Sequence, residues 1–115
     1  MRNQALRVTT MFVSVTKSPG GPDGGGRFGL RVPLADRKEF FDRKWTDVEL
    51  EIDGEFHRFT LKPSFWHNTS VIHDNEGYSV IGKWLKRHRV TEWTSGAPHR
   101  VTLVPLDGNR FRLVA

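Results

Sequence analysis

A glycine-rich loop with a cation at each end lies between two stretches that read as β-strands. Residues 17–27 contain five glycines and two prolines, and Lys17 and Arg27 stand at the two ends. Such a segment buries little apolar area against its ordering entropy, so it does not build a core. Bare backbone and two cations are instead suited to approach an anionic partner. The loop therefore reads as a recognition arm.

A second polar segment carries side chains that can read base edges. Residues 63–77 are irregular in pattern and rich in His, Asn and Ser. In this segment Asn75 suits bidentate pairing with adenine, and Asp74 or Glu76 can accept from the amino group of cytosine. Arg27 of the first loop suits guanine in the same way. The alternative is that both loops are merely solvated, with Asp74 and Asn75 forming a turn.

The sequence supports a catalytic site or a metal site less well than it supports DNA binding. The Asp-x-Lys fragments at residues 36–38 and 42–44 lie in or beside a predicted short helix, without a strand or a partner acid. Glu49, Glu51 and Asp53 form the outward face of an amphipathic strand. The five histidines lack close metal-ligand spacing, and there is no cysteine. We therefore assign no catalytic residue, no metal and no cofactor.

Composition favours one basic domain over residues 1–115, with residues 1–7 as a flexible N-terminus. Hydrophobic residues make up 37% and charged residues 27%, and the net charge is +5. Positive charge favours polyanion partners such as nucleic acid, although a merely soluble basic protein is the alternative. No apolar run approaches the roughly 18 residues of a membrane span. The polar N-terminus is unlike a signal peptide, and the lack of cysteine suits an intracellular protein.

The hydrophobic pattern predicts a mainly β (α+β) fold. Asp53 and Gly54 form a favoured hairpin turn. Asp36 with Glu39 forms a capping box for a short helix, in which Phe40, Phe41 and Lys44 or Trp45 follow at helical spacing. A second helix is expected over residues 79–89, with Val80, Ile81, Trp84 and Leu85 on its apolar face. Predicted strands cover residues 8–15, 28–32, 48–53, 55–61, 100–104 and 110–114. About seven short strands without βαβ alternation favour a closed or half-closed barrel.

Three segments, in this order, carry a resemblance to a known family. They are residues 17–33 with the run Gly25, Gly26 and Arg27; the Asp74–Glu76 element; and Trp84 followed by residues 93–98. The chain resembles a B3-like DNA-binding pseudobarrel, in particular the N-terminal recognition (effector) domain of EcoRII-type restriction endonucleases. The resemblance runs from about Phe12 to the C-terminus.

In that family two loops, the N-arm and the C-arm, clasp the major groove of duplex DNA. The resemblance implies an N-arm at residues 17–27, extending to Arg31, and a C-arm between residues 67 and 78. The C-arm segment has fewer Arg and Lys than is typical, and the basic run at residues 83–89 is the alternative alignment. The DNA-binding residues expected are Lys17, Ser18, Asp23, Gly25, Gly26, Arg27, Arg31, His67, Asn68, Ser70, His73, Asp74, Asn75, Glu76 and Tyr78.

The function predicted is sequence-specific binding of double-stranded DNA by a non-catalytic effector domain of a type II restriction endonuclease. The resemblance implies a nuclease domain in the full-length protein, a CC(A/T)GG-like site, a bacterial cytoplasmic restriction-modification system and no membrane partner. Two alternatives remain: a small Mg²⁺-dependent nuclease, and a β-barrel that binds single-stranded nucleic acid or protein.

Overall fold

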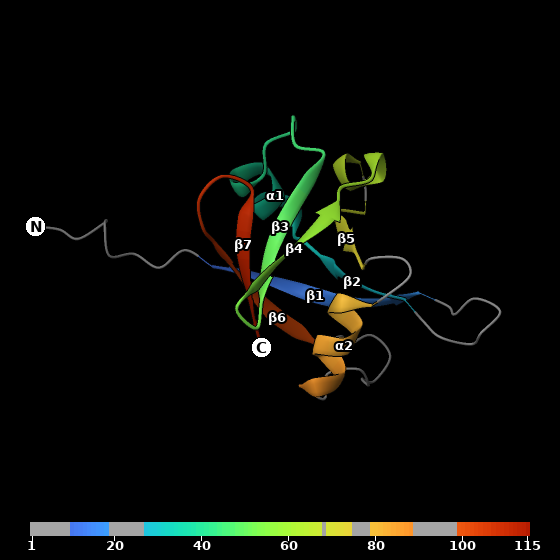
Figure 1. Cartoon of the computed structure of the whole chain (residues 1–115). Helices are drawn as coiled ribbons and strands as arrows, with labels where there is room; N and C mark the ends of the chain where they lie inside the picture. Colours follow the sequence, from blue (N-terminus) through green and yellow to red (C-terminus); the bar gives the residue numbers. More distant parts are fainter. Residues whose placement is uncertain (1–9, 19–26, 68, 75–78, 89–98) are drawn as a thin grey trace, which may run out of the picture.

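The computed structural model describes residues 10–18, 27–67, 69–74, 79–88 and 99–115, with the side chain of Ser18 left out (Figure 1). These residues form seven strands, two α-helices and one 3-10 helix. In chain order the elements are β1 (Met11–Ser18), β2 (Arg27–Arg31), α1 (Leu34–Phe40), β3 (Asp47–Ile52), β4 (Glu55–Thr60), η2 (Pro63–Trp66), β5 (Val71–His73), α2 (Val80–Arg87), β6 (Arg100–Pro105) and β7 (Arg110–Val114).

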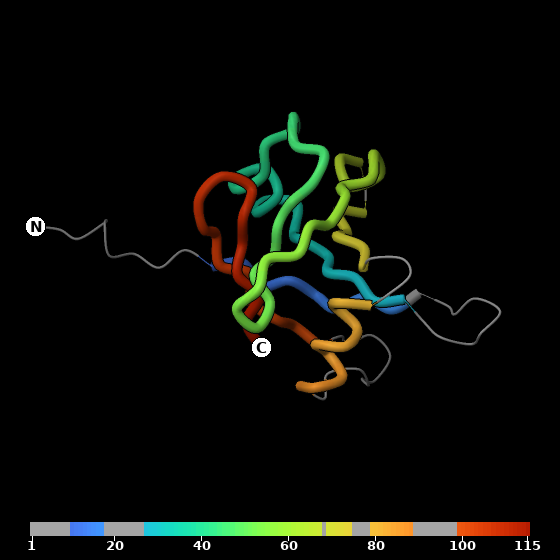
Figure 2. The backbone as a smooth tube through the Cα atoms, in the orientation of Figure 1, coloured from blue at the N-terminus to red at the C-terminus, as the bar shows by residue number. Residues whose placement is uncertain are grey.

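All seven strands belong to one sheet that is nearly closed. Its order is β4-β3-β7-β6-β1-β2-β5, and each neighbouring pair is antiparallel except the parallel pair β3 and β7. The two edge strands, β4 and β5, contact each other, so the sheet curls into a barrel (Figures 1 and 2). The prediction of a mainly β, barrel-like fold is confirmed.

The core follows the alternation of the strands. Val48, Leu50 and Ile52 of β3 are buried, as the two-residue period predicted. Ile81, Trp84 and Leu85 bring the apolar face of α2 into the same cluster. Strands with one buried face and a helix with one apolar stripe therefore share a single core.

The tight turn between β3 and β4 has the predicted conformation. Asp53 and Gly54 both have positive φ, 52° and 85°, which is the signature of a type I′ hairpin turn. The turn sets the register, because Ile52 pairs directly with Glu55. Gly108, at φ 58°, lies in the turn between β6 and β7.

Three local predictions were wrong. Helix α1 begins at Leu34 after Pro33 and has no side-chain cap hydrogen bond, so Asp36 does not form the predicted capping box. The helix ends at Phe40, because Phe41 is extended, and it does not reach Lys44 or Trp45 as predicted. Pro33, at φ −57°, is the N-cap residue, three residues before the N-cap position predicted for Asp36. The segment predicted as irregular contains η2 and β5, and β5 is a strand because it pairs with β2.

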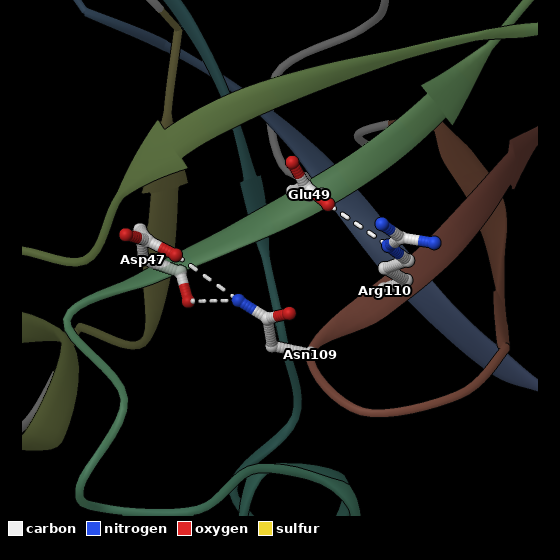
Figure 3. Close-up of polar contacts among 4 residues, drawn as sticks. All are labelled: Asp47, Glu49, Asn109 and Arg110. Atoms are coloured by element: carbon white, nitrogen blue, oxygen red, sulfur yellow. Dashed lines mark hydrogen bonds and ion pairs between the residues drawn. The ribbon is translucent and has the colours of Figure 1, made fainter.

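Carboxylates on the outer face of β3 pair with arginines of β7 (Figure 3). Glu49 accepts from Nε of Arg110 at 2.9 Å, and Glu51 accepts from Nε of Arg112 at 2.5 Å. Beside them Nδ2 of Asn109 donates to the backbone and side-chain oxygens of Asp47, each at 3.0 Å. The predicted outward acidic face of β3 is therefore a ladder of surface ion pairs.

Gly29 of β2 lies where three groups leave no room for a side chain. A Cβ added there meets Cγ1 of Val71 at 2.8 Å, Oγ1 of Thr16 at 2.9 Å and the carbonyl oxygen of Ile72 at 3.0 Å. Because one of these groups is backbone, β2 and β5 must separate to accept a methyl group. We expect Gly29→Ala to lower the free energy of unfolding by about 1–2 kcal/mol in urea titrations. An unchanged midpoint would contradict this.

Candidate nucleic-acid interface

The structure brings together the strand ends from which the two predicted arms begin. The hairpin of β1 and β2 is paired up to Ser18 and Arg27, the two residues that flank residues 19–26 in the sequence. On the other side of β2, Gly29 pairs with His73, the last residue of β5. The amide of Asp74 then donates to the carbonyl oxygen of Phe28 at 3.1 Å. Segments some 45 residues apart in sequence thus begin from one rim of the barrel (Figure 1).

Two cations stand at this rim. Lys17 is exposed, and its ammonium nitrogen lies 5.7 Å from the centre of the Phe28 ring. The Phe28 ring is itself buried, so the cation–π contact positions the Lys17 ammonium group over a side chain that the core holds in place. Arg27 is exposed at the first position of β2. Both expected cations of the N-arm therefore lie at the base of the loop.

Arg31 lies farther from this rim. It is exposed at the last position of β2, opposite Ser14 of β1 and Val71 of β5. Four residues along a strand separate it from Arg27 by roughly 13 Å. Arg100 of β6 pairs with the same Ser14, so two arginines flank that serine on the sheet. Arg31 and Arg100 extend the cationic surface along the barrel.

His73 lies at the rim where the two predicted arms begin, and it pairs with Gly29 of β2. Its side chain is half-buried. Burial lowers the pKa of its imidazole below the ordinary value, and the positive charges of Lys62 and Arg27 lower the pKa further. The two causes act in the same direction, since a low dielectric and nearby cations both disfavour the protonated form. His73 is therefore mainly neutral at pH 7.

Asp74 holds the start of α2. Its Oδ1 accepts from the amide of Ile81 at 2.9 Å, and its Oδ2 accepts from the amide of Gly82 at 2.8 Å. Oδ2 also accepts from the hydroxyl of Ser79, which precedes the helix. A carboxylate that satisfies the free amides of a helix start is a capping group, here supplied from seven residues upstream. Asp74 was expected to contact DNA, and the structure places its carboxylate on α2.

Ser70 lies inside the molecule. It is 1% exposed and has φ 51°, and its hydroxyl accepts from Nη1 of Arg37 at 3.0 Å. The same nitrogen donates to the carbonyl oxygens of Phe65, at 2.6 Å, and His67, at 3.0 Å. Ser70 was also expected to contact DNA, but its hydroxyl is engaged by a buried guanidinium.

Sequence reasoning did not single out Arg37. A basic residue in a short polar helix reads as exposed, yet Arg37 is 8% exposed and bridges α1 to the chain before β5. One signal was available, because Arg37 is three and four residues before Phe40 and Phe41 and so shares their side of a helical turn. Through residues 65–70, Arg37 anchors the segment that leads into β5.

The remaining expected residues divide into two groups. His67 is exposed, and its carbonyl oxygen is one of the acceptors of Arg37. The others lie outside the described residues: Asp23, Gly25, Gly26, Asn68, Asn75, Glu76, Tyr78 and the side chain of Ser18. The predicted bases of the arms are thus described, and their tips are not.

Some of the exposed cations in the described part of the chain are neutralised by ion pairs, and others are not. Within the described ranges the ion pairs join Arg87 to Asp53 and the two β7 arginines to β3. The other exposed cations of these ranges that make no ion pair lie on several elements, and Lys38, Arg43, Lys44, Arg58, Lys83 and Lys86 are among them. Four more, Lys17, Arg31, Lys62 and Arg100, lie beside β1, β2 and β5. Charge on β3 and β7 is neutralised locally, whereas charge beside β1, β2 and β5 is open to an external anion.

The described part of the chain contains neither a cluster of metal ligands nor a helix that could span a membrane. No group of three or more His, Asp or Glu side chains in it is arranged to hold a metal ion. None of its helices has the length and apolar character required to cross a bilayer. Comparisons with protein-family models, with curated proteins and with solved structures gave no match.

Proposed function

We propose that this protein binds double-stranded DNA at the rim where its two loops begin. The observation that carries the proposal is the pairing of β2 with β5, which brings the paired end of β1 and β2 at residues 18 and 27 to the same rim as residues 73 and 74. A duplex presents phosphates on both sides of each groove, so paired loops from one rigid rim suit it. Lys17 and Arg27 would contact phosphates or guanine, and residues 75–78 would supply further contacts.

The finer proposal is that the chain acts as the recognition (effector) domain of a type II restriction endonuclease. Its support is the order of motifs in the sequence together with the barrel-like, seven-stranded sheet. In that role the loops are the two arms, the site read is CC(A/T)GG-like, and the chemistry belongs to a nuclease domain elsewhere in a bacterial cytoplasmic protein.

The double variant Lys17→Ala with Arg27→Ala tests the interface. Loss of two phosphate contacts should weaken binding to a duplex at least about tenfold at 100 mM salt and lower the salt slope by about 2. Fluorescence anisotropy over a salt series measures both quantities. Arg110→Ala with Arg112→Ala is the charge-matched control, because those arginines already pair with Glu49 and Glu51. Equal losses in the two double variants would point to net charge rather than to this rim.

Selection of bound sites from a random duplex pool tests sequence specificity. Enrichment of a short motif is expected, and enrichment of none would remove the sequence-specific part of the proposal. Equal affinity for single strands would favour a single-strand binder instead. Plasmid cleavage with Mg²⁺ that is abolished by Asp42→Ala would establish the nuclease alternative.

A further inference from the structure

His73 is a titratable group placed at the joint base of the two loops. It pairs across the sheet with Gly29 and follows Val71 and Ile72, which are buried. Half-burial keeps the imidazole within reach of the surface while it limits contact with water. A ligand that covers this rim therefore meets the histidine at a partly desolvated position, where charges act more strongly than in bulk water.

The charged groups next to His73 can be named for each described element that adjoins it. Lys62, which follows β4, and Arg27 of β2 act on the imidazole, and both are positive. From β1, the residue in line with Gly29 and His73 is the uncharged Thr16. On the side of α2, the carboxylate of Asp74 accepts from two helix amides and the Ser79 hydroxyl, so it is directed to the helix. Among the described residues, the charges that lower the pKa of His73 are therefore those of the two cations.

We propose that His73 takes up a proton from solvent when a phosphate of the bound duplex reaches this rim, and that the imidazolium then contacts that phosphate. The inference rests on the proposed DNA-binding function. A phosphate places a negative charge next to His73, which favours the protonated imidazole and offsets the repulsion from Lys62 and Arg27. DNA binding at this site is consequently linked to pH.

The direction of the linkage follows from the two states. In the free protein the pKa of His73 lies below its ordinary value, and phosphate raises it in the complex. Above the higher pKa both states are neutral and affinity is independent of pH. As pH falls through that value affinity rises, and it levels off below the pKa of the free protein. Each unit by which binding raises the pKa strengthens binding about tenfold at low pH.

Calorimetry and anisotropy test this coupling with one duplex at constant ionic strength. We expect wild-type affinity to be roughly three- to tenfold higher at pH 5.5 than at pH 8, an excess lost in His73→Gln. Calorimetric titrations with the duplex at pH 6.5, in buffers of different ionisation enthalpy, should show that binding takes up a fraction of a proton. This uptake should be absent in His73→Gln. His57→Gln on β4, where the histidine is also half-buried, is the matched control and should keep both effects.

Direct titration of His73 by NMR keeps the test independent of the folding of any variant. Its imidazole resonances in the wild-type protein should titrate at a higher pH with duplex than without it. An unchanged or lower titration midpoint, or proton uptake that persists in His73→Gln, would overturn the inference while DNA binding stands. Failure of the wild-type protein to bind any duplex at any pH would overturn the proposed function and this inference together.

Discussion

Arg37→Met is expected to lower the free energy of unfolding by about 3 kcal/mol or more. The substitution keeps an apolar stem but leaves three acceptors without their donor: the carbonyl oxygens of Phe65 and His67 and the hydroxyl of Ser70. Ser70 is 1% exposed and Phe65 is fully buried, so water does not readily replace the guanidinium. Each buried acceptor left unsatisfied costs about 1–3 kcal/mol.

Urea unfolding measures the effect, and the chain offers a matched control. The guanidinium carbons of Arg37 and Arg43 each lie 5.8 Å from the centre of the Trp66 ring. Arg43 is exposed, however, and makes none of the three hydrogen bonds. Arg43→Met should therefore change the midpoint little. Similar losses for both variants would mean that contact with Trp66, rather than the buried hydrogen bonds, is what stabilises this region.

Asp74→Ala is expected to cost about 2–3 kcal/mol of unfolding free energy. The variant removes the acceptor of two helix amides and of the Ser79 hydroxyl. Loss of an ordinary cap costs about 0.5–2 kcal/mol, and hydrogen bonds to a charged, part-buried acceptor are stronger. Helix α2 also contributes Ile81, Trp84 and Leu85 to the core, so fraying at its start disturbs packing.

Asp42→Ala is the control for the Asp74 variant. Oδ1 of Asp42 accepts from the amide of Lys44 at 2.8 Å, but this hydrogen bond is exposed and caps no helix. The expected change in urea midpoint is small, because water replaces the lost acceptor. A small change in Asp74→Ala as well, with loss of DNA binding alone, would contradict the capping role and favour direct contact of Asp74 with DNA.

Local signals were sufficient for much of the fold. The alternation of Val48, Leu50 and Ile52, followed by Asp53 and Gly54, predicted the β3–β4 hairpin, because strand period and turn chemistry are properties of neighbouring residues. The apolar face of α2 was predicted for the same reason. Strand β5 was missed, because three residues carry no period and their strand conformation depends on pairing with β2.

The candidate site was predictable as two segments but not as an arrangement of side chains. Sequence placed cations at the ends of a glycine-rich loop and hydrogen-bonding groups near residue 73. Polar residues of this one segment have different surroundings in the structure. Asp74 caps α2, Ser70 is buried and accepts a hydrogen bond from Arg37, and His73 is half-buried at the rim. Short polar side chains satisfy backbone groups and ligands equally well, so only their neighbours separate the two roles.

Residue types and spacing by themselves determined that this is a basic, mainly β chain with a glycine-rich loop between Lys17 and Arg27. These are consequences of composition and of periods that span a few residues. Tertiary structure decided that this loop begins beside His73 and Asp74, and that Arg37 is buried. Both outcomes depend on strand pairing and core packing between segments 28 to about 45 residues apart, which no local pattern encodes.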